Sequence, residues 1–105
     1  MPKGYVVVTE KIHDPEGMKA YSRVAGPSLR AGGARVLVVD RDPEVLEGDW
    51  SYTQTVVLEF DSVEAARAWY TSDAYQEAAK LRHAAADSDA VLLAGFAPAG
   101  AAGGQ

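Results

Sequence analysis

The residues best suited to chemistry gather in the second half of the sequence. Glu59 closes an apolar run, and Tyr75 and Arg82 lie on the helical segment that follows. Tyr75 and Arg82 share a helical face, because positions i and i+7 align after two turns. A buried guanidinium needs a partner, and Glu59 is the expected one, with Glu10 as the second choice. Arg82, Tyr75 and Glu59 are therefore candidate catalytic residues.

This cluster has a structural and a functional interpretation. The structural one is an ion pair that locks a helix to the sheet. The functional one is an arginine, Arg82, that holds a carboxylate or an enolate oxygen of a ligand. Trp69, Tyr75 and Tyr21 could line a cavity for a flat apolar molecule together with Arg82, although aromatic residues at helical spacing more often form a core.

His13 is a fourth catalytic candidate, because it stands in a strand-to-helix turn beside Asp14. Such turns often carry functional groups on a rigid scaffold, and a histidine there could act as a general base. The alternative is a solvent-exposed loop histidine, since Asp14 is already needed to cap the next helix. Two distant histidines and no cysteine make poor zinc ligands, and no phosphate-binding glycine motif is present. No metal and no cofactor are therefore expected.

The bulk properties limit the classes of protein that the chain can belong to. Its 105 residues suit one domain, expected over residues 1–96, with a disordered Ala/Gly-rich tail at residues 97–105. The net charge is -5 and there is no basic run, so nucleic acid is not an expected partner. No apolar stretch is long enough for a membrane span or a signal peptide. A cytoplasmic protein without membrane contact is expected.

Four strand-like segments and three helical segments alternate in a recognisable order. Strands are predicted over residues 4–12, 34–40, 52–60 and 89–96, from their β-branched and apolar content. Helices are predicted to begin after Asp14, after Asp61 or Ser62, and after Ser72, which are candidate capping residues. The order βαββααβ predicts an α+β, ferredoxin-like fold with a four-stranded antiparallel sheet and helices on one face.

The strands also predict a homodimer. Segments such as YVVV, VLVV and AVLL are continuous apolar runs rather than alternating ones, so both faces of the sheet should be covered. The helices of the chain can cover only one face. A second copy of the same sheet is the simplest cover for the other, and it would bury roughly 2,000 Å² or more in total.

Several pieces of the sequence together resemble a known family. They are Tyr5, Tyr21, Gly32-Gly33, Glu47-Gly48, VVLEF before Ser62, AARAWY, SDAYQ, Arg82 and Gly95. In this spacing the chain resembles, over about residues 4–96, the domains of unknown function numbered 1330, small members of the dimeric α/β-barrel superfamily. It departs from the family in having Asp61 where Pro is common, and Gln54 or its neighbour where Arg is frequent.

The resemblance implies a ferredoxin-like protomer and a homodimer, and leaves the activity open. Relatives in the wider superfamily include cofactor-independent monooxygenases, isomerases, cyclases and haem proteins. The first expectation is a homodimer that binds a small organic molecule between helices and sheet. The alternatives are a cofactor-independent monooxygenase, isomerase or cyclase acting on an aromatic or polyketide-like metabolite, and a purely structural homodimer.

Overall fold

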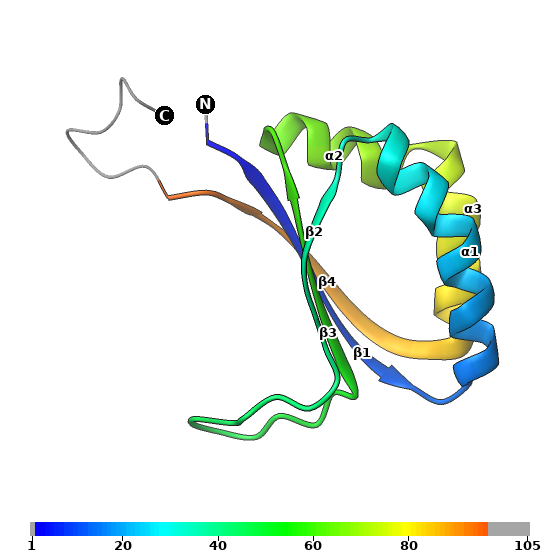
Figure 1. Cartoon of the computed structure of the whole chain (residues 1–105), viewed down its shortest axis with the longest axis vertical. Helices are drawn as coiled ribbons and strands as arrows, with labels where there is room; N and C mark the ends of the chain where they lie inside the picture. The colour runs from blue at the N-terminus through cyan, green and yellow to red at the C-terminus, as the bar shows by residue number, and fades with distance from the viewer. Residues whose placement is uncertain (1, 97–105) are drawn as a thin grey trace.

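In the computed structural model, which describes residues 2–96, three helices lie against one face of a four-stranded antiparallel sheet (Figure 1). The strand order across the sheet is β2-β3-β1-β4. The elements are β1 (Gly4–Ile12), α1 (Pro15–Ala31), β2 (Arg35–Asp40), β3 (Gln54–Phe60), α2 (Val63–Thr71), α3 (Asp73–Ala85) and β4 (Ala86–Ala94). The predicted α+β, ferredoxin-like order is confirmed.

The three predicted helix starts are confirmed by cap hydrogen bonds, and Ser62 rather than Asp61 caps the second helix. Asp14 Oδ1 accepts from the Gly17 amide at 3.1 Å, and proline occupies the start of the helix after it. Ser62 Oγ accepts from the backbone N–H at position 65 at 3.0 Å, and Ser72 Oγ accepts from the Tyr75 amide at 3.2 Å. Each cap satisfies a backbone donor that the first turn of its helix leaves unpaired.

The last strand differs most from its predicted bounds, because it begins at Ala86 rather than at position 89. Helix α3 passes into β4 without a connecting loop. The carbonyl of Ala85 accepts hydrogen bonds from the amides of His13 at 3.0 Å and Asp14 at 3.1 Å, so the turn after β1 holds this junction. No Gly or Pro marks the change, and the sequence therefore carried no local turn signal. The predicted tail at residues 97–105 lies outside the described residues.

The core lies between the sheet and the helices. Val6 and Leu58 face each other across β1 and β3 on the inner face of the sheet, and both are buried. Above them Trp69 packs on Phe60 and on Tyr75, with ring centroids 5.3 and 4.1 Å apart. Aromatic residues of this size each bury roughly 150–250 Å² and dominate the energetics of a small core.

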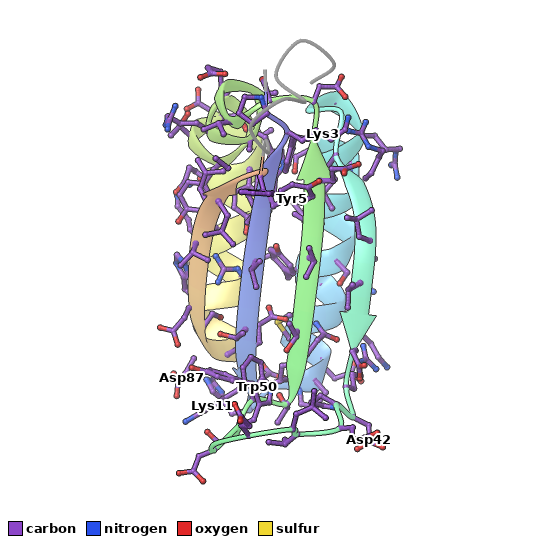
Figure 2. All side chains as sticks on the ribbon, turned by 90° about the vertical axis from the view of Figure 1, so that its left-hand side faces the viewer. Lys3, Tyr5, Lys11, Asp42, Trp50 and Asp87 are labelled. Carbon is purple, nitrogen blue, oxygen red and sulfur yellow. The ribbon has the colours of Figure 1, made fainter. Side chains whose placement is uncertain are left out.

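Within residues 2–96, no helix covers the outer face of the sheet (Figure 2). Strand alternation directs Val7 and its cross-strand partners Val57 and Val91 to this face. Val38, Val91 and Leu93 are 41%, 51% and 49% exposed. Exposed apolar side chains thus extend over several strands. Among residues 2–96, no helix is long and apolar enough to cross a membrane.

Candidate functional site

Five polar side chains lie between the helices and the inner face of the sheet, and we call them the inner polar cluster. Its members are Glu10, Tyr21, Gln54, Tyr75 and Arg82. Glu10, Arg82 and Gln54 are only 1%, 2% and 8% exposed. The antiparallel register places Glu10 directly opposite Gln54 on β3, so strand pairing and helix packing bring the cluster together.

One part of the cluster reaches the surface through a chain of hydrogen bonds. Gln54 Nε2 donates to Glu10 Oε1 at 2.7 Å. Arg41, which follows β2, donates from Nε to Gln54 Oε1 at 2.8 Å. The buried carboxyl group is thereby linked through one amide to an exposed guanidinium.

The other part of the cluster is built on Tyr75. Its hydroxyl accepts from Arg82 Nε at 3.3 Å and shares a 2.9 Å hydrogen bond with the hydroxyl of Tyr21. The Arg82 guanidinium also lies over the Tyr21 ring, 6.0 Å from its centroid. The predicted helical pairing of Tyr75 with Arg82 is therefore confirmed as a direct contact.

Burial controls the ionisation of the cluster. It raises the pKa of Glu10, and the hydrogen bond from Gln54 and the charges of Arg82 and Arg41 only partly oppose this rise. It also raises the pKa of Tyr21, with the neighbouring Tyr75 as the next cause. Burial lowers the pKa of Arg82, but Tyr75, Tyr21 and Glu10 outweigh it and the net pKa is raised. A raised carboxyl pKa is found both in buried structural acids and in functional sites.

A buried hydroxyl accompanies Glu10 on its other side. Ser88 on β4 is the cross-strand partner of Glu10, and its Oγ is buried without a hydrogen-bond partner among residues 2–96. A buried polar atom without a partner is uncommon and costs stability. The strand positions around Glu10 are thus more polar than packing alone requires.

The predicted grouping of Glu59 with Tyr75 and Arg82 is wrong, because Glu59 lies on the opposite face of the sheet. Leu58 and Phe60 face the helices, so strand alternation turns the residue between them outward. The second choice, Glu10, is the carboxylate whose charge acts on Arg82, although no ion pair within 4.0 Å joins the two residues in the described part of the chain.

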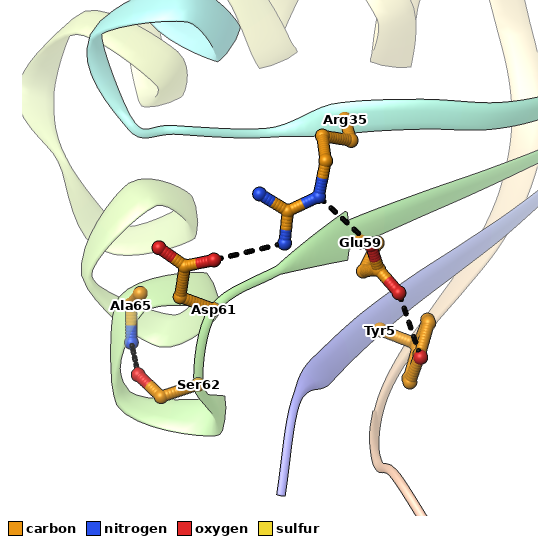
Figure 3. A network of polar contacts seen from close by, with 6 residues as sticks. All are labelled: Tyr5, Arg35, Glu59, Asp61, Ser62 and Ala65. Atoms are coloured by element: carbon orange, nitrogen blue, oxygen red, sulfur yellow. Dashed lines mark hydrogen bonds and ion pairs between the residues drawn. The ribbon is translucent and has the colours of Figure 1, made fainter.

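On the outer face, Glu59 belongs to a separate network near one end of the sheet (Figure 3). Its carboxylate accepts from Tyr5 OH at 2.8 Å and from Arg35 Nε at 2.8 Å. Arg35 also donates to Asp61 Oδ1 at 3.0 Å. The Arg35 guanidinium, followed by Tyr5, lowers the pKa of Glu59. The contacts with Tyr5 and Arg35 thus satisfy the Glu59 carboxylate on β3 without a ligand.

A cleft of about 340 Å³ opens between α1 and the end of the sheet where β1 finishes and β3 begins. We call it the α1–β3 cleft. Met18 and Ser22 on α1 form one wall, and Arg41 and Gln54 form part of the other. The remaining lining residues are Ile12, Pro15, Lys19 and Thr53. The chain of hydrogen bonds that starts at the buried Glu10 ends in this cleft.

The other predicted site residues lie elsewhere. His13 is exposed in the turn after β1, and Trp69 is a core residue. Tyr21 belongs to α1, and Tyr75 and Arg82 belong to α3. None of the three is among the residues that line the cleft. A second cavity of about 200 Å³, between α2 and β4, is mainly apolar. Within residues 2–96 no group of three or more His, Cys, Asp or Glu side chains could hold a metal ion.

Sequence reasoning missed Arg41 and the α1 residues of the cleft. Arg41 stands in a turn-rich connection beside two acids, where a solvated charge is the ordinary interpretation. The sequence drew attention to Gln54 or its neighbour only as a position where the resemblance leads one to expect Arg. Only the structure shows that a guanidinium from a different segment reaches the same place.

The order of the elements and the sheet topology define an α+β protein of the ferredoxin-like class. More specifically, the chain belongs to the family described as Domain of unknown function (DUF1330), which matches residues 3–96. None of the curated proteins matches the chain.

Solved structures share the fold at low sequence identity. A protein of unknown function from Rhodopseudomonas palustris is 24% identical, with a TM-score of 0.73 over 92% of this chain and 85% of that one. A dimeric ferredoxin-like protein of unknown function from Thermobifida fusca is 16% identical (TM-score 0.63; 89% and 91% covered). SnoaB, a cofactor-independent oxygenase from Streptomyces nogalater, is 15% identical (TM-score 0.65; 95% and 99% covered).

Proposed function

We propose that the protein is a homodimer that binds a small organic molecule in the α1–β3 cleft. The observation that carries the proposal is the cleft itself, in which apolar side chains such as Met18 and Ile12 stand beside Arg41, Gln54 and Ser22. A mainly apolar wall with a few placed polar groups is the usual composition of a small-molecule site. Its volume of about 340 Å³ is near the lower end for such sites.

Filling the cleft tests this proposal. Ser22→Trp places an indole at the α1 wall, whereas Arg23→Trp places the same group on the neighbouring exposed position that does not line the cleft. A fragment library is screened by ligand-observed NMR against the native protein and both variants. We expect hits that Ser22→Trp abolishes and Arg23→Trp retains. Hits that survive in both variants would place binding elsewhere and contradict the proposal.

The outer face of the sheet supports the homodimer. Apolar patches larger than a few hundred Å² are unusual on monomers and mark interaction surfaces. Val38, Val91 and Leu93 are all half-exposed there, and the Thermobifida relative of the same fold is described as dimeric. A second copy placed on this face would cover these side chains with the same face of its own sheet, which is the arrangement of a two-fold symmetric interface.

Light scattering tests the homodimer with a matched pair of substitutions. Val38→Glu puts a charge on the outer face, at a side chain that is 41% exposed. Val24→Glu puts the same charge on α1, at a side chain that is 45% exposed. We expect the native protein and Val24→Glu to have the mass of a dimer and Val38→Glu to shift towards monomer. A monomeric native protein at micromolar concentration would contradict the proposal.

A cofactor-independent enzyme is the second candidate, and the buried carboxyl group of Glu10 favours it. Its raised pKa suits a proton acceptor or donor, and the Streptomyces oxygenase performs its chemistry on the same fold. The activity would be that of a monooxygenase, isomerase or cyclase on an aromatic or polyketide-like metabolite. Mass spectrometry of candidate substrates incubated with the native protein and with Glu10→Gln provides the test. Equal conversion by the two proteins would exclude a proton-transfer role for Glu10.

A further inference from the structure

Arg41 is a cationic side chain of the α1–β3 cleft that forms no direct ion pair among residues 2–96. Two cationic side chains, Lys19 and Arg41, line the cleft, and no carboxylate does. Lys19 is paired with Glu16 at 3.4 Å. Arg41 has no ion pair within 4.0 Å in the described part of the chain. In a protein with a net charge of -5, the side chains that line the cleft thus include two cations and no anion.

The chemistry of the three hydrogen-bonded groups fixes the orientation of Gln54. An arginine Nε can only donate, so the amide must present its Oε1 to Arg41, as it does at 2.8 Å. The Nε2 group then faces Glu10 and must find an acceptor there, which the Oε1 of Glu10 supplies at 2.7 Å. Reversing the amide would place two donors against each other at Arg41. Arg41 and the buried carboxylate of Glu10 therefore favour the same orientation of Gln54.

We propose that the cleft selects a small organic anion, whose carboxylate binds Arg41, and that Glu10 is a positioning residue that orients Arg41 through Gln54. This inference rests on the proposed function, because it names the ligand class of the same cleft. Glu10 itself does not line the cleft, so in this role it acts through Gln54.

The groups that remain free in the cleft define the ligand. The Nε of Arg41 is occupied by Gln54, and its terminal N–H groups have no hydrogen-bond partner among residues 2–96. Two parallel terminal donors match the two oxygens of a carboxylate. Thr53 Oγ1 is already engaged by the backbone of β1, donating at 3.0 Å and accepting at 2.8 Å. The apolar side chains of Ile12 and Met18 then contact the body of the ligand. A cationic ligand would be repelled by Arg41.

Benzoate and benzamide form a matched pair of probes, because they share a shape and differ in charge. Each is titrated into the isotope-labelled native protein, and amide resonances of Met18 and Ser22 report binding in the cleft. We expect benzoate to bind about tenfold or more tightly than benzamide, as a charge-assisted bidentate contact allows. In Arg41→Gln the ratio of the two affinities is expected to approach one. Equal affinities in the native protein would overturn the choice of an anion.

The positioning role of Glu10 is tested by the same ratio, which a purely structural role would not change. Glu10→Met removes the acceptor and frees the amide of Gln54, so the ratio should fall roughly threefold or more. Glu10→Gln keeps an acceptor oxygen at this place and should retain the native ratio. If Glu10→Met does not fold, Gln54→Met breaks the same chain and should lower the ratio equally. A native ratio in Glu10→Met or in Gln54→Met would overturn the positioning role.

The outcomes separate this inference from the proposed function. If benzamide and neutral fragments bind in the cleft as well as benzoate does, the cleft is a small-molecule site without anion selectivity, and only this inference fails. If neither the probes nor any library fragment shifts the resonances of the cleft, the proposed function fails, and this inference fails with it.

Discussion

Replacing Tyr75 with phenylalanine removes one hydroxyl from the centre of the inner polar cluster and leaves its ring in place. That hydroxyl makes two contacts, accepting from Arg82 at 3.3 Å and pairing with Tyr21 at 2.9 Å. Tyr75 is 1% exposed and Arg82 is 2% exposed, so water cannot readily replace the lost partner. The substitution thus tests whether the cluster contributes to stability.

The expected cost follows from these two contacts. Losing the pair with Tyr21 costs about 1 kcal/mol, and leaving the buried Nε–H of Arg82 without an acceptor costs about 1–3 kcal/mol more. We therefore expect Tyr75→Phe to lower the free energy of unfolding by about 2–4 kcal/mol, a large share of the roughly 5–15 kcal/mol that stabilises a typical domain. Tyr21→Phe removes only one contact and should cost about 1 kcal/mol.

Urea unfolding at a fixed protein concentration measures the effect, because the stability of the proposed homodimer would depend on concentration. The fluorescence of Trp69, which packs 4.1 Å from the Tyr75 ring, reports the transition. Tyr70→Phe is the matched control, since the Tyr70 side chain is 37% exposed and its hydroxyl makes no hydrogen bond among residues 2–96. It should stay within about 0.5 kcal/mol of the native protein. A Tyr75→Phe variant as stable as this control would refute the reasoning.

Three further predictions concern pH and packing. Burial raises the pKa of Glu10 above its ordinary 4.5, so the stability that Glu10 contributes is full below pH 4.5 and is lost as the pH rises through the folded pKa. The Glu10→Gln variant should therefore be more stable than the native protein at neutral pH, and chemical unfolding should show that this gain vanishes in acid. Arg35 lowers the pKa of Glu59, so the stability that Glu59 contributes is present above pH 4.5 and is lost as the pH falls through the folded pKa. The Glu59→Gln variant should therefore lose less stability in acid than the native protein does, as chemical unfolding at several pH values would show. A Cβ at Gly32 would lie 2.9 Å from Cδ1 of the buried Trp69; Gly32→Ala should cost about 1–3 kcal/mol in the same urea assay.

The sequence predicted the elements of the fold well, because strong local patterns mark them. Asp14, Ser62 and Ser72 each announce a helix with a capping side chain, and the first strand has the predicted bounds. The junction at Ala85 was missed, since it is held by hydrogen bonds from a turn far away in the sequence. Local patterns cannot report such a contact.

The candidate site was predicted in part. Tyr75 and Arg82 were paired correctly, because helical spacing fixes which residues share a face. Glu59 was assigned to the wrong face, because the continuous apolar run before it contains no alternation that shows which residues point inward. Arg41 was not considered, since its contact with Gln54 depends on how a long connection returns to the sheet.

The direct passage from α3 into β4 determines where the chain tolerates a change of length. Consecutive residues of a strand point to opposite faces, so one residue added after Ala85 would exchange the inner and outer faces of β4. Ser88 would then leave its place beside Glu10, and Val91 would turn from the outer face towards the core. The connection at residues 41–53 has no such constraint. Added length is therefore far better accommodated there than at the helix-to-strand junction.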